Sequence, residues 1–393
     1  MGSEKRHNAS EVIRTRIPRT ASMEHASPLY LTSSFCYQNA EEMRAVFAGE
    51  EKANIYSRFI NPSVTEFQER MCVLEGTEAA MATASGMSAN FAAFMSLLSA
   101  GEHLISGSAI FGSTHSMITR YLPKWGIKHS FFDMRNPDEL EKLVRPETKL
   151  LYVETPSNPG LDLADLALLN TFAKAHDLIF VVDNTFASPI FQQPKKFGAD
   201  LIIHSATKWI DGQGRTLGGV VCGPHKYIDE IFTFCRNTGP SLSPFNAWLL
   251  SSGLETLAVR MEKHAENAMI LAEWLAENHH VSATRYPFLP SHPQYELAKK
   301  QMKTGGGVVC FEVKGGLAQG KKFLDNLKML SVTANLGDVR SIASHPASTT
   351  HAKLSEEEKL KTGITSGLIR VSVGLEDVND VIADIDQALA NSK

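Results

Sequence analysis

The stretch Asp200-Leu201-Ile202-Ile203-His204-Ser205-Ala206-Thr207-Lys208 decides both the fold and the chemistry of this chain. An apolar run with the character of a buried strand ends in two hydroxyl side chains and one lysine. Burial disfavours the charged form of a lysine, so its amine becomes a nucleophile. Ser205 and Thr207 add hydroxyl groups suited to a phosphate. The pattern is typical of a site for a carbonyl cofactor that carries a phosphate, and a surface lysine just past a strand is the alternative.

A carboxylate ends a second apolar run. Asp183 follows Leu178-Ile179-Phe180-Val181-Val182, and a buried carboxylate is costly unless it meets a cation. The protonated ring nitrogen of pyridoxal 5'-phosphate (PLP) is such a cation. An aspartate that caps the turn at Asn184-Thr185 is the alternative interpretation. Lys208 and Asp183 together predict PLP as the cofactor.

Residues 82–88 predict a phosphate site at the start of a buried helix. Ser85 is suited to the N-cap position, and Gly86 permits close approach of the backbone. The free N–H groups of a helix start bind phosphate. Residues 152–159 predict another strand, which ends in a polar turn that contains Asn158.

The apolar runs predict an α/β fold with a mostly parallel sheet. Continuous apolar strands indicate a sheet that is covered on both faces. Ligands of such sheets bind at the carboxyl ends of the strands, where Asn158, Asp183 and Lys208 all fall. The strands are expected at residues 103–106, 149–153, 178–182 and 201–204.

Three parts of the chain are expected. Residues 1–60 are polar and punctuated by Pro18 and Pro28, which suits an arm that packs on a neighbouring subunit. Residues 61–255 carry the predicted cofactor site, and residues 256–393 form a smaller C-terminal domain. A single long amphipathic helix over residues 255–278 is expected to lead into that domain. A strand at 307–313 and a helical tail from Asp377 complete it.

Composition limits the possible functions. The 393 residues are 43% hydrophobic and 21% charged, so a large core and more than one domain are expected. A formal net charge of −4 favours neither nucleic acid nor an anionic membrane as a partner. Five scattered cysteines, an N-terminus without an apolar signal region, and the lack of a spanning apolar run predict a cytoplasmic protein.

No metal site is expected. His345 and His351 flank Thr349-Thr350, but no acidic or cysteine residue near them has the spacing of a metal ligand.

Seven stretches of this chain, in the same order, resemble the Cys/Met-metabolism family of PLP enzymes, the cystathionine γ-synthase-like group. The resemblance implies an aspartate-aminotransferase-like fold (fold type I), with a seven-stranded, mostly parallel sheet, helices on both faces and a smaller C-terminal α/β domain. The stretches are Tyr56-Ser57-Arg58-Phe59-Ile60-Asn61-Pro62, Ser85-Gly86-Met87, Glu154-Thr155-Pro156-Ser157-Asn158-Pro159, Val182-Asp183-Asn184-Thr185, Ser205-Ala206-Thr207-Lys208, Gly253-Leu254-Glu255-Thr256-Leu257 and Ile369-Arg370-Val371-Ser372-Val373-Gly374.

The resemblance also implies a role for each site residue. Lys208 would anchor the cofactor and act as the base. Arg370 would bind the substrate α-carboxylate, with Asn158 as its helper. The alternative for Arg370 is a structural salt bridge. Phe111 stands where much of the family has a tyrosine that stacks on the pyridine ring. Phenylalanine keeps the stacking but lacks the hydroxyl, so any role of the tyrosine hydroxyl would pass to Lys208, Tyr56 or water. Tyr56 and Arg58 would reach the phosphate of a neighbouring subunit's cofactor. The cofactor-binding residues expected are Ser85, Gly86, Met87, Phe111, Asn158, Asp183, Thr185, Ser205, Thr207 and Lys208, with Tyr56 and Arg58.

Two segments separate the branches of the family. Residues 211–219 are similar to O-succinylhomoserine sulfhydrylases, and so is Asn335-Leu336-Gly337-Asp338, where the wider family usually has Ser in place of Asn335. Arg340 stands where cystathionine-using relatives often carry Glu. An arginine suits a distal carboxylate, so Arg340 or Arg215 is expected to bind the succinyl group, and exposed or internally paired arginines are the alternative.

The expected reaction is therefore PLP-dependent γ-replacement, in which O-succinylhomoserine and sulfide give homocysteine and succinate in methionine biosynthesis. The resemblance implies a homotetramer built as a dimer of dimers. Cystathionine γ-synthase, O-acetylhomoserine sulfhydrylase and, less favoured, methionine γ-lyase are the alternative activities. A non-catalytic scaffold that has lost PLP is the alternative of another class.

Overall fold

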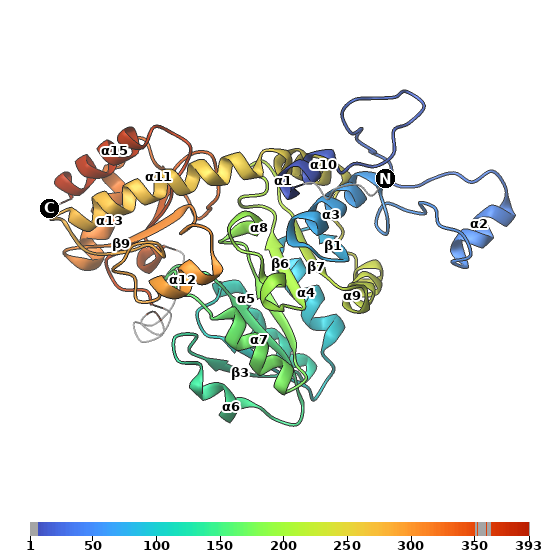
Figure 1. The fold of residues 1–393 in the computed structure, drawn as a ribbon, viewed down its shortest axis with the longest axis horizontal. Helices are drawn as coiled ribbons and strands as arrows, with labels where there is room; N and C mark the ends of the chain where they lie inside the picture. Colours follow the sequence, from blue (N-terminus) through green and yellow to red (C-terminus); the bar gives the residue numbers. More distant parts are fainter. Residues whose placement is uncertain (1–6, 350–351, 353–358, 360–362, 393) are drawn as a thin grey trace.

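Figure 1 shows the fold of the protein in a computed structural model, which describes residues 7–349, 352, 359 and 363–392. The extreme N-terminus, residues 1–6, and His351 entered the sequence interpretation but lie outside the described residues.

A seven-stranded sheet forms the centre of the larger part of the molecule. Strand β7 is antiparallel to both of its neighbours, and the other neighbouring strands are parallel, which confirms the expected mostly parallel sheet. In spatial order the strands are β1 (Ala79–Thr83), β7 (Gly219–Gly223), β6 (Leu201–Ser205), β5 (Ile179–Asp183), β4 (Thr148–Glu154), β2 (His103–Gly107) and β3 (Lys128–Phe132).

Helices cover both faces of this sheet. Successive side chains of a strand point to opposite faces; accordingly Val182 joins one hydrophobic core cluster and Val181 the other. Both faces need apolar cover, which explains why the strands read as continuous apolar runs. One face packs against α3 (Pro62–Glu75), α7 (Leu166–Ala175) and α10 (Pro244–Glu255), and the other against α4 (Gly86–Leu97) and α9 (His225–Thr238).

A second, smaller sheet lies in the C-terminal part. Only β10 and β11 are parallel in it, and its helices enclose a separate hydrophobic core (Figure 1). Its strands are β10 (Ser331–Val332), β11 (Ile342–Ser344), β12 (Leu368–Ser372), β9 (Val308–Val313) and β8 (Val281–Arg285), and its helices are α11 (Leu257–Glu277), α13 (Gly316–Asn326) and α15 (Val378–Asn391). The expected strand at 307–313 and the helical tail after Asp377 are both present.

The helix expected over residues 255–278 is confirmed as α11, which agrees with it within two residues at each end, and a separate helix, α10, precedes it. Helix α10 ends at Glu255 and α11 begins at Leu257. The Arg260 guanidinium donates to the carbonyl oxygen of Gly253 near the end of α10, and its Nε donates to Thr256 Oγ1. These hydrogen bonds from the Arg260 side chain satisfy the Gly253 carbonyl, which in a continuous helix would accept from the backbone amide four residues later. The division of the chain into 61–255 and 256–393 stays a prediction.

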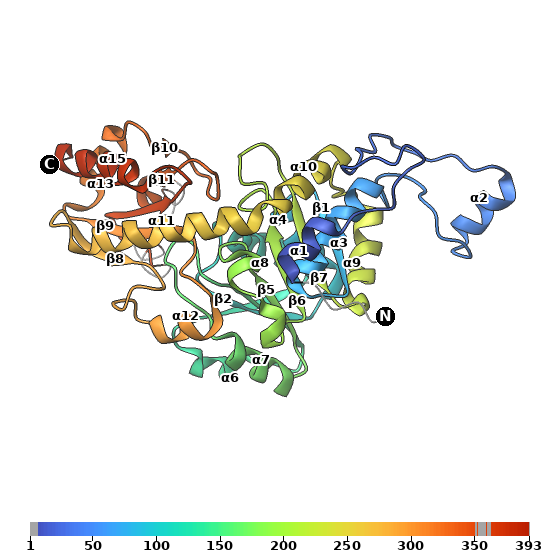
Figure 2. The same cartoon turned by 45° about the horizontal axis from the view of Figure 1, so that its top comes forward.

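The N-terminal segment extends away from the rest of the molecule. Helix α1 (Asn8–Arg14) packs on the body, where Val12 joins the main core, and α2 (Ala40–Phe47) lies on a long projecting loop in both views (Figures 1 and 2). Met23 and Leu31 are more than 70% exposed on it. The shorter helices elsewhere are α5 (Gly112–Ser116), α6 (Leu140–Leu143), α8 (Ser188–Phe191) and α12 (Tyr295–Gln301), with a π-helical turn at Met117–Tyr121.

Candidate active site

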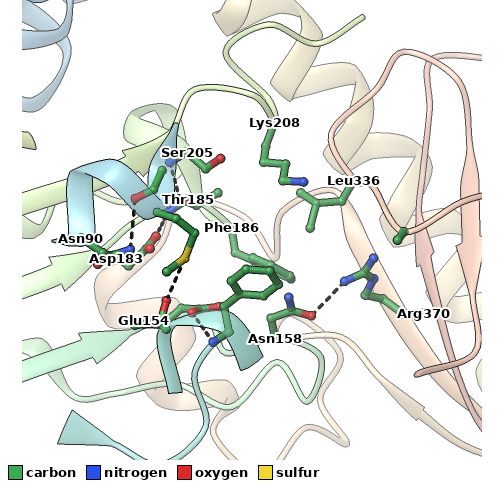
Figure 3. A pocket seen from close by; sticks show the side chains of 15 residues that line it. Asn90, Glu154, Asn158, Asp183, Thr185, Phe186, Ser205, Lys208, Leu336 and Arg370 are labelled. Carbon is green, nitrogen blue, oxygen red and sulfur yellow. Dashed lines mark hydrogen bonds between the residues drawn. The ribbon is translucent and has the colours of Figure 1, made fainter. Parts of the chain in front are cut away.

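A pocket opens at the carboxyl ends of β4, β5 and β6, where the sequence places it. Residues from the region around the smaller sheet close its other side (Figure 3). Its lining consists of Gly86, Met87, Asn90, Phe111, Thr114, Glu154, Asn158, Asp183, Thr185, Phe186, Ser205, Lys208, Ala334, Leu336 and Arg370.

Lys208 reaches into this pocket from the turn that follows β6. Its Nζ donates a hydrogen bond of 2.6 Å to Asn335 Oδ1. Burial, with a smaller contribution from the positive charge of Arg370, lowers the pKa of Lys208 to about 8. A substantial fraction of the amine is therefore neutral near physiological pH, as a nucleophile or a base requires. Lys208 is not the surface lysine of the alternative interpretation.

Asp183 ends β5 with its side chain in the pocket. Its Oδ1 accepts from the backbone amide of Thr185 at 3.0 Å, and its Oδ2 accepts from the hydroxyl of Tyr152 at 3.4 Å. Thr185 Oγ1 in turn accepts from the Ser205 amide at 2.9 Å, which joins the ends of β5 and β6. Asp183 therefore caps its turn and also lines the pocket, so the two interpretations of this residue are compatible.

The start of α4 lies directly against the end of β6. Ser85 is the N-cap, and its Oγ accepts from the Ser88 amide at 3.1 Å, as expected. A Cβ atom at Gly86 would lie 2.7 Å from the Cβ of Ser205, so only glycine permits this approach. The first-turn amides of α4 thus lie beside the Ser205 hydroxyl at the pocket wall, an arrangement suited to a phosphate.

Arg370 lies on β12 and faces the pocket from the side opposite the sheet of β5. Its guanidinium donates to Asn158 Oδ1 at 2.9 Å and to the carbonyl oxygen of Asn335 at 3.0 Å. Its Nε is buried and has no hydrogen-bond partner among the described residues. Within the same residues, Arg370 forms no salt bridge. The structural ion pair considered for this residue is therefore absent from the described part of the chain, and the guanidinium is available to an anionic ligand.

Glu154 is a pocket residue that the list of expected site residues lacked. It ends β4 as Asp183 ends β5, and its Oε2 accepts from the Phe111 amide at 2.7 Å. The sequence contains a signal for this residue, because an acid closes the apolar run of β4 just as Asp183 closes that of β5. Asn90, Thr114, Phe186, Ala334 and Leu336 were also missed, since the fold alone brings them to the pocket.

Four expected cofactor residues, Ser85, Thr207, Tyr56 and Arg58, do not line this pocket. Thr207 Oγ1 accepts from the Gly218 amide at 3.1 Å. The Arg58 guanidinium lies over the rings of Phe59, at 4.7 Å, and Tyr56, at 5.6 Å, and donates to the carbonyl oxygen of Arg236. Roles for Tyr56 and Arg58 in another subunit's pocket stay a prediction.

The two arginines expected to bind the succinyl group are paired within the chain. Arg340 Nε lies 2.8 Å from Asp338 Oδ1, and Arg215 Nε lies 3.1 Å from Asp211 Oδ1. Neither arginine lines the pocket. Arg340 is the more exposed of the two, with 64% of its side-chain surface accessible against 34% for Arg215.

The His345 ring contacts Ser348 Oγ and the carbonyl oxygen of Ser366, both at 2.8 Å. Its possible partner in a metal site, His351, lies outside the described residues.

The residues of the pocket fit PLP. Lys208 offers a partly neutral amine, Asp183 a carboxylate, and the tight approach of Gly86 to Ser205 a cradle for a phosphate. The family model described as Cys/Met metabolism PLP-dependent enzyme matches residues 10–390. The chain belongs to this family. Its cofactor is PLP, and its fold is that of the fold type I PLP enzymes.

Relatives within the Cys/Met metabolism family match nearly the whole chain. The O-succinylhomoserine sulfhydrylase of Pseudomonas aeruginosa is 48% identical over 95% of this chain and 92% of its own length. The O-succinylhomoserine sulfhydrylase of Mycobacterium tuberculosis is 43% identical over 96% of this chain and 94% of its own. The L-methionine gamma-lyase of Porphyromonas gingivalis is 43% identical over 93% of this chain and 92% of its own length. Relatives with two different activities therefore match at similar identity.

Solved structures show the same fold. A proposed O-acetylhomoserine (thiol)-lyase of Campylobacter jejuni, which contains N'-pyridoxyl-lysine-5'-monophosphate, superposes with a TM-score of 0.94 at 35% identity, over 98% of this chain and 99% of that chain. The metB protein of Corynebacterium glutamicum superposes with a TM-score of 0.92 at 33% identity, over 99% of both chains. In the described part of this chain, none of the helices has the length and apolar character needed to cross a bilayer.

Proposed function

We propose that the chain catalyses γ-replacement on O-succinylhomoserine, with sulfide as the nucleophile, to give homocysteine and succinate. The observation that carries the proposal is the presence, in one pocket, of the low-pKa amine of Lys208 and the buried guanidinium of Arg370, whose Nε has no hydrogen-bond partner among the described residues. This combination suits an amino-acid substrate, because the guanidinium binds its α-carboxylate while the amine acts at Cα.

Each residue has a defined part in this proposal. PLP, when bound, supplies the electron sink that stabilises negative charge at Cα. Asp183 would pair with the ring nitrogen of the bound cofactor, and the start of α4 with Ser85, Gly86, Met87 and Ser205 would hold its phosphate. Lys208 takes the proton from Cα, and Asn335 Oδ1 keeps the amine in place through the 2.6 Å hydrogen bond. Arg370, aligned by Asn158, fixes the carboxylate.

The choice of ester and nucleophile is supported by the relatives and by the branch segments. Two O-succinylhomoserine sulfhydrylases match at 48% and 43% identity, and residues 211–219 and 335–338 are similar to that branch. Methionine γ-lyase is the second candidate, because such enzymes match at 41–43% identity. A cytosolic location is part of the proposal, supported by five free thiols.

One assay separates these activities. The purified PLP-loaded protein is offered O-succinylhomoserine or O-acetylhomoserine, each with sulfide or with cysteine, and separately methionine alone. We expect homocysteine and succinate from the succinyl ester with sulfide. Cystathionine as the main product would indicate a γ-synthase, and ketobutyrate with methanethiol from methionine would indicate the lyase. A protein without a visible PLP absorbance band would be the inactive scaffold.

A further inference from the structure

Two carboxyl groups lie side by side in the pocket. Glu154 and Asp183 are partners in register at the ends of the parallel strands β4 and β5, and both line the pocket. Glu154 is 3% exposed and Asp183 is 8% exposed. Two neighbouring carboxylates in a buried site repel each other, so one of them retains its proton at a pH where an isolated acid would have lost it.

The surroundings of Glu154 favour the proton on this residue. Asp183 faces it from β5, the Tyr152 hydroxyl lies on its own strand, and Arg370 faces it from β12. Arg370 does not neutralise it directly, since its guanidinium donates to Asn158 and Asn335. Burial first, and the charge of Asp183 second, raise the pKa of Glu154 well above its ordinary value.

Glu154 also joins two parts of the pocket wall. Its Oε2 accepts from the amide of Phe111, the residue before α5, at 2.7 Å. The backbone amide of Asn158, in the turn after β4, is also near enough to act on the pKa of this carboxyl group. The side chains of Phe111 and Asn158 both line the pocket, so this carboxyl group fixes where they stand.

We propose that Glu154 is a positioning residue that remains an uncharged carboxylic acid, holding the Phe111 and Asn158 backbones while Asp183 carries the carboxylate charge of the pocket. A second anion beside the PLP ring would oppose the withdrawal of electrons from the substrate, and an uncharged acid makes the same backbone contacts without that cost. The inference rests on PLP as the cofactor and is independent of which ester is the substrate.

The first test uses cofactor-free protein and the Glu154→Gln variant. Below pH 4.5, the ordinary pKa of a glutamic acid, the residue is protonated in the folded and the unfolded wild type. As the pH rises above that value, only the unfolded state loses the proton, so the wild type loses stability relative to the variant by about tenfold in the folding equilibrium constant per pH unit. The loss stops once the folded Glu154 ionises.

We therefore expect the difference in Tm between Glu154→Gln and wild type to grow with pH from about 4.5 and then level off. Glu273→Gln, on the exposed surface of α11, is the matched control, for which the difference should stay flat. The inference would be overturned if the stability of Glu154→Gln relative to wild type stayed constant or fell with rising pH. Such a result would mean that Glu154 is ionised in the folded wild type.

A spectroscopic readout on folded protein completes the test. The infrared difference between wild type and Glu154→Gln at neutral pH should contain the C=O stretch of a protonated carboxylic acid, and its absence would overturn the proposal. In loaded protein, Glu154→Ala should weaken PLP binding about ten- to a hundredfold, and Glu154→Gln should rescue most of this loss. A glutamine variant as impaired as Asp183→Asn would instead mean that the charge of Glu154 is required. The product assay above fails or succeeds independently of these results.

Discussion

The amine of Lys208 combines a hydrogen bond to Asn335 with a pKa of about 8, and both features depend on where the chain buries it. Lys208→Ala should abolish the covalent attachment of PLP and the γ-replacement reaction, because the anchor and the base are the same group. PLP should still bind through the phosphate site. Absorbance spectra and single-turnover assays measure the two effects. A variant with near-native turnover would refute the assignment of Lys208.

The pH dependence of cofactor loading follows from the same residue. Only the neutral amine attacks a carbonyl, so the rate at which added PLP becomes attached to the cofactor-free protein should rise with pH and level off above about 8. Arg370→Met removes a nearby positive charge, which should move the midpoint to higher pH. The shift should be partial, because burial is the larger cause. An unchanged midpoint in Arg370→Met would show that this charge does not act on Lys208.

Arg340 is the arginine that we propose binds the succinyl carboxylate. Its loop also carries Ala334 and Leu336, which line the pocket, but in the free protein Asp338 pairs with it. Arg340→Ala, or failing that Arg215→Ala, should lower kcat/KM for the succinyl ester about ten- to a hundredfold and leave the acetyl ester nearly unchanged. Equal losses toward both esters would remove both arginines from substrate recognition and leave them as internally paired side chains.

At the scale of the element, the contact between the start of α4 and the end of β6 builds the phosphate site. Gly86→Ala would place a Cβ atom 2.7 Å from the Cβ and 2.9 Å from the Cα of Ser205, so the helix must move away from the strand. We expect markedly weaker PLP binding, measured by titration of the cofactor-free protein. Ser96→Ala, near the far end of the same helix, is the control and should bind PLP normally. Equal affinity in Gly86→Ala would show that this contact does not shape the phosphate site.

At the scale of the whole molecule, the projecting N-terminal segment supports a site shared between subunits. Tyr56 and Arg58 lie outside the pocket of their own chain, and we propose that they serve a neighbour's pocket within a dimer, which pairs into a tetramer. Refolding Arg58→Ala together with Lys208→Ala should then restore activity at about one quarter of the wild-type sites if subunits mix randomly.

The control for this experiment mixes Lys208→Ala with Asp183→Asn. Both changes affect the chain's own pocket, so every hybrid site remains defective and activity should stay low. If well-folded hybrids of Arg58→Ala and Lys208→Ala are no more active than this control, the pocket is complete within one chain.

The sequence by itself determined the sheet and the centre of the site. Continuous apolar runs specify buried parallel strands, and Lys208 and Asp183 end two of them, so their meeting follows from the rule that such strands end at one edge. The cap at Ser85 was equally local, whereas the need for glycine at position 86 comes from its contact with Ser205 on β6. The hydrogen bond of Arg260 to the Gly253 carbonyl, which joins α11 to the end of α10, was not visible in the sequence pattern.

Only the tertiary structure decided which groups face one another across the pocket. The contact of Asn335 with Lys208 joins segments far apart in the chain, which sequence periodicity cannot predict. The contact of Arg370 with Asn158 was expected only through the family resemblance. The register of β4 and β5 sets Glu154 beside Asp183, and the proposed protonation of Glu154 depends on this contact. The pairing of Arg340 with Asp338 could not be predicted either, because the sequence of a loop does not show which charged side chains contact each other. Local patterns specify elements and their ends, whereas desolvation and charge pairing arise when the elements meet.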